Sequence, residues 1–362
     1  LKDGKLLYAE RLYRSIMQSC PNHPEANQNL GVLDTNKLIQ LYQNGQYDDA
    51  KKLAQSLTER LPKYTFAWSI LGAIFGQTGM HTEALNANKT AVILSPQDAQ
   101  VHYNLGITLK ELGRLDEAEA SYRQAIALQP ENAQAHNNLG LTLEELGRLD
   151  EAEASYKQAI GVKADYAAAH HNLSIMKKFE SQDEQFLKMQ ELNLDENTSE
   201  EERCHINFGL AKACEDLGDF DKAFKHFTEG NALRKKSLNY DISQDERYYK
   251  QIKSNYQPIA QHSIDIDKSE KNLIPIFIVT ELMKVSKGNK IVTDKMPHNF
   301  LYIGLIVSTF PEAKIVHVKR DPAAVCWANY KQNFTSKDLG YCYALDDIIS
   351  YHRLYENLME FW

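Results

Sequence analysis

Residues Leu109–Ala127 read LKELGRLDEAEASYRQAIA, and residues Leu143–Gly161, which begin 34 positions later, read LEELGRLDEAEASYKQAIG. The same interval extends upstream in a series of glycines and a series of alanines: Gly45, Gly79, Gly113 and Gly147, and Ala50, Ala84, Ala118 and Ala152. Self-similarity at a fixed period of about 20–50 residues is typical of repeats that bury their apolar faces against one another. The sequence therefore predicts an array of stacked repeats.

The pattern resembles the tetratricopeptide repeat, in which each unit is a pair of antiparallel helices. We expect the Leu105-Gly106 pair in the first helix, where the missing side chain lets the second helix approach closely. Gly113 is expected at the turn, because a positive φ costs glycine little. The acidic run that follows favours a helix start. Ala118 would keep the two helices close, and Tyr122 would fill the volume beyond.

Four full repeats are expected at 31–64, 65–98, 99–132 and 133–166, with a half unit from 167, so that the repeat region covers residues 1–174. A degenerate unit containing Leu210-Ala211, Gly218 and Ala223 predicts a capping helical region at 175–240. Residues 241–272 are charged and are interpreted as a connector.

The first repeat is out of register with the others. Ala9, Tyr13 and Pro21 resemble the second helix of an additional unit, but Ala9 and Ala50 are 41 residues apart rather than 34. We therefore expect a break near Leu33–Asp34, caused by an insertion or by residues absent from the chain.

Asparagines recur at one repeat position, as Asn104, Asn138 and Asn172. In tetratricopeptide superhelices this position lines the concave surface, where carboxamides could hold the backbone of a protein or peptide substrate. The alternative is that three solvated asparagines were copied by duplication. Histidines also recur, as His102, His136 and His170, but one side chain per repeat does not converge on a single ion, so no metal is expected.

Beyond the connector the periodicity changes. Short β-rich runs at 273–279, 290–293 and 313–318 predict strands, and helices are expected at 300–309 and 323–334. This order is typical of an open parallel α/β sheet, in which ligands bind beyond the carboxyl ends of the strands. Residues 273–362 are therefore interpreted as part of an α/β domain.

Two stretches there, TDKMPHNFLYIGLI from Thr293 and FPEAKIVHVKRDPAAVCWANYKQNF from Phe310, resemble the sulfotransferases. They are most similar to bacterial fusions of tetratricopeptide repeats with a P-loop-like domain related to tyrosylprotein sulfotransferases. The resemblance implies transfer of a sulfuryl group from 3′-phosphoadenosine-5′-phosphosulfate (PAPS) to a protein or peptide hydroxyl, with tyrosine favoured. A tetratricopeptide scaffold whose transferase domain has decayed is the alternative.

The resemblance also assigns two residues. Arg320 matches the arginine that holds the 3′-phosphate of the nucleotide, and a guanidinium can bind phosphate with two hydrogen bonds. Lys295 matches the lysine of the D-K-x-P turn, which contacts the donor and neutralises charge on the bridging oxygen during transfer. The alternatives are a surface arginine paired with Asp321 and a turn lysine held by Asp294.

The chain departs from this family in two places. Ala328 stands where the family has a serine that binds the 3′-phosphate. The expected strand ending at Val279 runs directly into Thr280 without the loop that wraps the 5′-phosphosulfate and without the acidic general base that follows it. We therefore expect a segment to be missing near 278–280, and further segments to follow Trp362.

Charge and cysteine content limit the remaining possibilities. The 362 residues carry a net charge of −8, but residues 271–362 hold 11 Lys and Arg against 9 Asp and Glu. Without a concentrated basic surface, a nucleic-acid partner is disfavoured. No apolar run reaches the roughly 18 residues of a membrane span. The five scattered cysteines form no C-x-x-C pair, which favours a reducing cytoplasm.

Overall fold

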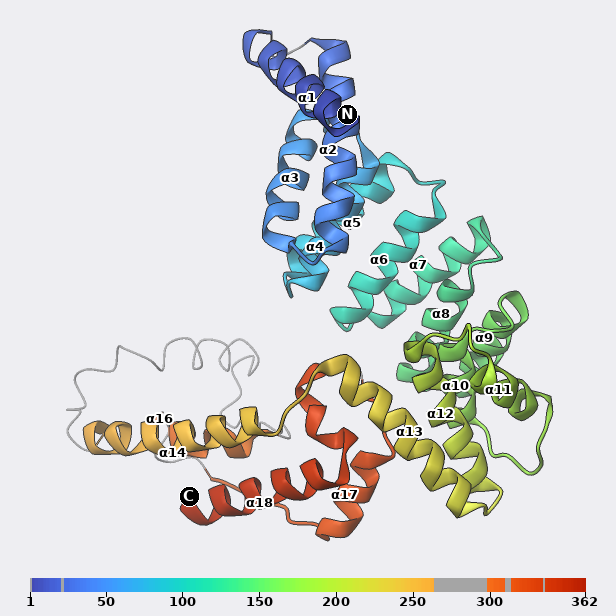
Figure 1. Ribbon diagram of the computed structural model, residues 1–362, viewed down its shortest axis with the longest axis vertical. Helices are drawn as coiled ribbons and strands as arrows, with labels where there is room; N and C mark the ends of the chain where they lie inside the picture. The colour runs from blue at the N-terminus through green and yellow to red at the C-terminus, as the bar shows by residue number, and fades with distance from the viewer. Residues whose placement is uncertain (1, 21–22, 264–297, 310–313, 335) are drawn as a thin grey trace. The chain divides into compact units, whose positions relative to one another are not determined.

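The computed structural model describes residues 2–20, 23–263, 298–309, 314–334 and 336–362 (Figure 1). These residues are arranged in helices, turns and extended segments, and no strand occurs among them. The chain divides into two compact units, Leu1–Lys178 and Phe179–Trp362, here called the N-terminal and C-terminal units.

The N-terminal unit is a succession of helical pairs. Its helices are α1 (Lys2–Ser19), α2 (Pro24–Gln43), α3 (Tyr47–Arg60), α4 (Thr65–Gln77), α5 (His81–Leu94), α6 (Ala99–Glu111), α7 (Leu115–Leu128), α8 (Ala133–Glu145), α9 (Leu149–Val162) and α10 (Ala167–Met176). Each helix packs against the next one along the chain. The predicted repeats at 65–98, 99–132 and 133–166 each contain one pair, and α10 begins at the expected residue 167.

The glycines act as the sequence predicts. Gly113 and Gly147 stand at the turns between paired helices with φ of +68° and +76°, a region that side chains disfavour. Gly140 serves a different purpose, because a Cβ atom there would lie 2.5 Å from Cε1 of Tyr156. Tyr156 is fully buried, so its ring occupies the space that the glycine leaves.

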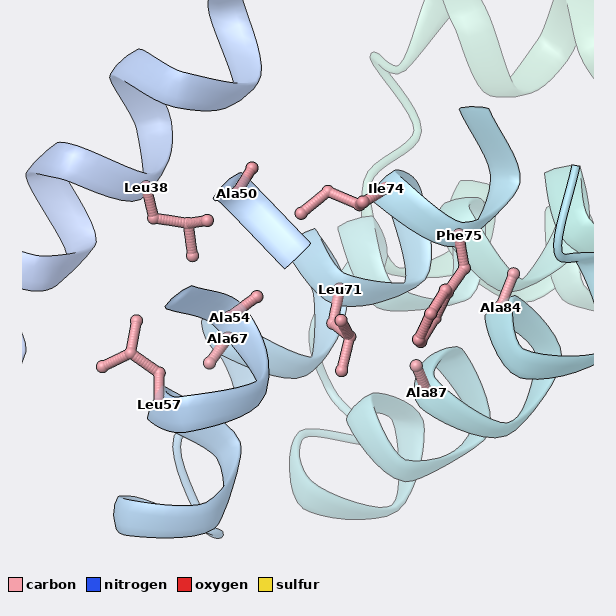
Figure 2. Packing of buried hydrophobic residues seen from close by; sticks show 10 residues of the cluster. All are labelled: Leu38, Ala50, Ala54, Leu57, Ala67, Leu71, Ile74, Phe75, Ala84 and Ala87. Carbon is pink, nitrogen blue, oxygen red and sulfur yellow. The ribbon is translucent and has the colours of Figure 1, made fainter. Parts of the chain in front are cut away.

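Buried side chains from successive helices form a continuous core. Figure 2 shows one cluster, contributed by α2, α3, α4 and α5: Leu38, Ala50, Ala54, Leu57, Ala67, Leu71, Ile74, Phe75, Ala84 and Ala87. Full burial of a leucine, isoleucine or phenylalanine side chain contributes about 1.5–3 kcal/mol, and the alanines allow the helix backbones to approach. Since no single pair encloses such a cluster, stacking of neighbours stabilises the unit.

The shift in register lies within α2. This helix has 20 residues, whereas α4, α6 and α8 have 13 each, and the difference of seven equals the excess in the spacing from Ala9 to Ala50. Helix α2 runs without interruption through Leu33 and Asp34, so about two additional helical turns account for the shift. The carboxylate of Asp34 is buried and accepts hydrogen bonds from Arg14 at 2.9 Å and Arg60 at 2.6 Å.

The C-terminal unit begins with another helical hairpin. Its elements are α11 (Glu184–Leu194), α12 (Glu200–Asp216), α13 (Phe220–Leu238), α14 (Ser243–Ser263), the 3₁₀ helix η1 (Asn299–Tyr302), α16 (Ile303–Thr309), α17 (Pro322–Tyr330), the 3₁₀ helix η2 (Lys337–Tyr343) and α18 (Leu345–Phe361). Gly218 joins α12 to α13 with φ of +78°, as in the repeats. Helix α13 contacts η2, and α14 contacts α16 and α18.

The predicted parallel sheet is not supported by the part of the chain that the structure describes, because no strand occurs in it. The expected third strand, 313–318, has no regular secondary structure at 314–318 and forms no ladder there, and Val316 and Val318 are exposed. A strand requires a paired neighbour. The other two expected strands, 273–279 and 290–293, lie outside the described residues. The two predicted helices are present, the second as α17, which ends at Tyr330 rather than at 334.

Candidate functional site

The turn Arg320-Asp321-Pro322 leads into α17. Asp321 is the N-cap of this helix, and its Oδ1 accepts a hydrogen bond from the backbone N–H of Ala324 at 2.8 Å. Pro322 occupies the first helical position, where its fixed φ suits the helix and its missing N–H is not needed. The local sequence thus fixes the start of α17 and places Arg320 immediately before it.

Arg320 is exposed, and no other described residue accepts a hydrogen bond from its guanidinium or forms an ion pair with it. The neighbouring Lys319, by contrast, pairs with Glu356 of α18 at 3.4 Å. The alternative pairing of Arg320 with Asp321 is not observed, since the Asp321 carboxylate caps the helix. The N-terminus of a helix carries partial positive charge. Arg320 and the start of α17 therefore form a positively charged corner that suits an anion.

The two faces of α17 differ. Trp327 and Tyr330 pack against α13: the Trp327 ring contacts the rings of Phe224 and Phe227 at centroid distances of 6.3 and 5.9 Å. Ala328, which replaces the family's serine, is exposed on another side and offers only a methyl group. No side-chain donor at position 328 therefore accompanies Arg320.

Lys295 and Asp294 lie outside the described residues, as does the junction at 278–280. His298 and η1 are the first described residues after the D-K-x-P motif. The indole N–H of Trp362 donates to the carbonyl of Phe300 at 2.8 Å, and the Trp362 ring meets Tyr256 of α14 edge-on at 4.9 Å. These contacts attach η1 to α14 and to the end of α18.

An acidic and aromatic cluster lies between α13, α14 and α18. Asp347 is buried and pairs with Lys235 at 2.5 Å. Burial raises the pKa of Asp245, against the effect of the hydrogen bond that it accepts from the Tyr240 hydroxyl. Sequence reasoning missed this cluster because Asp347 lies more than 100 residues from Lys235, Tyr240 and Asp245.

The three asparagines of the repeat position do not contact one another. Asn138 donates to the hydroxyl of Tyr103 at 3.1 Å, and Asn172 donates to Oδ1 of Asn137 at 2.9 Å. Both bonds join the first helices of consecutive repeats. Asn104 accepts from Gln100 within its own helix. Asn138 and Asn172 therefore link neighbouring repeats, whereas Asn104 does not.

A ring N–H at another repeat position bonds to the backbone six residues earlier. His102, His136 and His170 reach the carbonyls of residues 96, 130 and 164, each at 2.9 Å. Trp68 makes the same bond to residue 62, also at 2.9 Å. A carbonyl can only accept, so each histidine carries its proton on Nε2. Sequence reasoning missed this contact because two residue types share the role, although 34-residue spacing would have identified it.

Comparison with protein families identifies both parts of the chain. The sulfotransferase family matches residues 216–362, and the tetratricopeptide repeat matches 38–99 and 103–169. The chain therefore contains a tetratricopeptide region and a sulfotransferase-family domain, as the sequence predicts at this level.

One curated relative is an uncharacterized protein of Aquifex aeolicus (strain VF5), 24% identical over 258 residues. The match covers 52% of this chain, which spans about a third (34%) of the relative's length. Among solved structures, the chain is similar to PilW, a type IV pilus biogenesis factor, with a TM-score of 0.46 and 19% identity over 56% of this chain and 93% of the other. It is also similar to PilF of Pseudomonas aeruginosa, with a TM-score of 0.45 and 16% identity over 57% and 93%.

The described residues contain neither a membrane-spanning helix nor a metal-binding cluster. No helix among them is long and apolar enough to cross a membrane. Within the same residues, no three His, Cys, Asp or Glu side chains are grouped so that they could hold a metal ion.

Proposed function

We propose that this protein transfers a sulfuryl group from PAPS to a protein or peptide hydroxyl, with tyrosine as the favoured acceptor. The sulfotransferase-family match over 216–362 supports the reaction class. The observation that carries the nucleotide assignment is Arg320, an exposed guanidinium without a carboxylate partner among the described residues, placed at the start of α17.

The residues present fit a nucleotide 3′-phosphate at this corner. A phosphate needs cationic or N–H donors whose charge is not already neutralised, and Arg320 meets that requirement while Lys319 is paired with Glu356. Asp321 directs its Oδ1 to the cap, which reduces its competition for the guanidinium. Arg320 would bind and orient the nucleotide through this phosphate.

The resemblance gives Lys295 the catalytic role in the proposed reaction. The bond from sulfur to the bridging phosphate oxygen breaks and releases 3′-phosphoadenosine-5′-phosphate, a bond from sulfur to the acceptor oxygen forms, and the acceptor hydroxyl gives its proton to water. Lys295 would contact the donor and neutralise the negative charge that develops on the bridging oxygen.

The repeats would recruit the substrate. In this proposal Asn104, Asn138 and Asn172 line a concave surface and hold the backbone of an extended peptide. The bond from Asn138 to Tyr103 uses one of the two amide hydrogens, so the second hydrogen and the carbonyl oxygen can serve a peptide.

Calorimetry with 3′-phosphoadenosine-5′-phosphate tests the nucleotide site. Arg320→Ala is expected to weaken binding about 10–100-fold, because hydrogen bonds to charged groups contribute about 1.5–3 kcal/mol. Ala328→Ser should strengthen binding by supplying a second donor. Lys314→Ala is the control and should bind like the parent, since Lys314 is another exposed cation of the same segment, six residues before Arg320.

Transfer of label from PAPS to a tyrosine peptide tests the reaction. We expect Arg320→Ala to raise KM for PAPS, and Asn138→Ala to raise KM for the peptide without changing nucleotide affinity. If the parent protein releases no heat with the nucleotide, or if Arg320→Ala binds equally well, the sulfotransferase proposal fails. The non-catalytic scaffold would then be favoured.

A further inference from the structure

The C-terminal end of α17 is held by polar side chains of α13. The Asn231 side chain is 1% exposed, and its Nδ2 donates to the carbonyl of Tyr330 at 2.9 Å. Arg234, one turn further along α13, donates to the carbonyl of Phe334 at 3.1 Å. The last carbonyls of a helix have no partner within it, and burying them without one is unfavourable. Asn231 therefore satisfies a group that α17 cannot satisfy itself.

Three further contacts attach the same end of the helix. The Tyr330 side chain is buried, and its hydroxyl donates to Oγ1 of Thr228 at 3.2 Å. Trp327 packs on the aromatic residues of α13 described above. Lys331 forms an ion pair with Glu215 at the end of α12, at 2.7 Å. The α12–α13 hairpin thus helps to define where α17 lies, together with η2 and α18, which also contact α17.

The other end of α17 is exposed. Residues 314–320, which precede it, form an irregular segment that is exposed throughout, and surface contacts with α18 hold this segment. Helix α17 has nine residues and is about 13 Å long, so a tilt about Tyr330 displaces Arg320 by an amount that grows with this length, about 2 Å for a tilt of 10°. The buried attachment that fixes Arg320 therefore lies at the opposite end of the helix.

We infer that Asn231 is a positioning residue for nucleotide binding: through its bond to Tyr330 it holds α17, and with it Arg320, in the orientation that binds phosphate. The inference rests on the proposed function and extends it to the α12–α13 hairpin. It also explains why a carboxamide is buried where an apolar side chain of similar size would leave the Tyr330 carbonyl unpaired.

A double-mutant cycle on nucleotide affinity tests this role. We expect Asn231→Ala to weaken binding of 3′-phosphoadenosine-5′-phosphate about 10-fold. In the Arg320→Ala background the same substitution should have no further effect, because Asn231 acts only through Arg320. In Asn231→Ala, the backbone amide of Ala324 should exchange its hydrogen faster than in the parent, because its bond to Asp321 caps the start of α17.

Asn207→Ala is the matched control. Asn207 is also 1% exposed and also uses its carboxamide in hydrogen bonds, to Asn193, to the carbonyl of Arg203 and to His226 of α13, but none of these bonds reaches α17. This variant should lose stability without losing nucleotide affinity. If Asn231→Ala does not fold, Tyr330→Phe removes only the hydroxyl bond to Thr228 and should weaken binding about two- to threefold.

The outcomes separate the two proposals. If Arg320→Ala leaves affinity unchanged, the proposed function fails. If Arg320→Ala weakens binding but Asn231→Ala (or Tyr330→Phe in its place) does not, the positioning role is overturned. Additive losses in the double variant would also overturn it, since they would show that Asn231 acts independently of Arg320.

Discussion

The two units hold their helices by different means. In the N-terminal unit every helix contacts the next one, and His136 reaches a carbonyl only six residues away. In the C-terminal unit Asn231 and Tyr330 are 99 residues apart, and Glu215 and Lys331 are 116 apart. The first unit repeats short-range contacts, whereas the second depends on contacts that occur once and close long loops.

This difference determines how far a defect should spread. In a repeat array, stability is a sum of unit and nearest-neighbour contributions, so a defect weakens its own repeat and the adjacent ones. In the C-terminal unit, the loss of one contact loosens segments that are distant in sequence.

The largest expected effect comes from truncating one buried tyrosine in each unit. Tyr156→Ala removes a fully buried ring and should cost about 3–5 kcal/mol. Hydrogen exchange should increase mainly in α7, α8 and α9. Tyr351→Ala removes a ring that stacks on Tyr341 at 3.6 Å and meets Tyr249 edge-on at 5.6 Å. Exchange should then increase together in α14, η2 and α18.

Uniform exchange across the whole array in Tyr156→Ala would show that the repeats unfold as one cooperative block. The contrast between the two units would then be incorrect.

A smaller effect is expected from the same substitution at two helical glycines. Gly140→Ala places a methyl group 2.5 Å from the Tyr156 ring and should destabilise the array by about 1–2 kcal/mol, after the gain in helix propensity is included. Gly76→Ala is the matched control, because no atom lies within 4 Å of its Cβ position. This substitution should stabilise the array by about 0.5–1 kcal/mol. Urea denaturation measures the change in unfolding free energy for each variant. If both variants were more stable than the parent, or both less stable, the close-approach role of Gly140 would be contradicted.

The smallest effect concerns the ring N–H bonds between repeats. His136→Phe keeps the ring but loses the bond to the carbonyl of residue 130, and should cost about 1 kcal/mol. His136→Trp should recover most of this loss, because Trp68 makes the equivalent bond in an earlier repeat. Thermal unfolding compares the variants. A tryptophan variant no more stable than the phenylalanine variant would mean that the bond contributes little.

The same contrast explains what the sequence could predict. The positive φ of Gly147 and the start of α10 at residue 167 follow from local chemistry that recurs every 34 residues. The start of α17 at Asp321-Pro322 can also be predicted from the sequence, because an N-cap and a first-turn proline are local signals.

Contacts that occur once could not be predicted in this way. The bond from Asn231 to Tyr330 joins residues with no shared pattern, so only the folded chain reveals it. The expected strand at 313–318 failed for a related reason, since a β-rich composition does not provide a pairing partner. The assignments of Arg320 and Lys295 came from a resemblance and remain predictions.

The additional length of α2 shows which changes in spacing a helical array can absorb. Seven residues advance a helix by nearly two full rotations, leaving a residual angle of only about 20°. The residues on either side of the added segment therefore keep their orientation toward α1 and α3, and both helices contact α2. An insertion of five residues would rotate the flanking surfaces by about 140° relative to one another. In this fold the angular phase of an insertion, more than its size, decides whether it is tolerated.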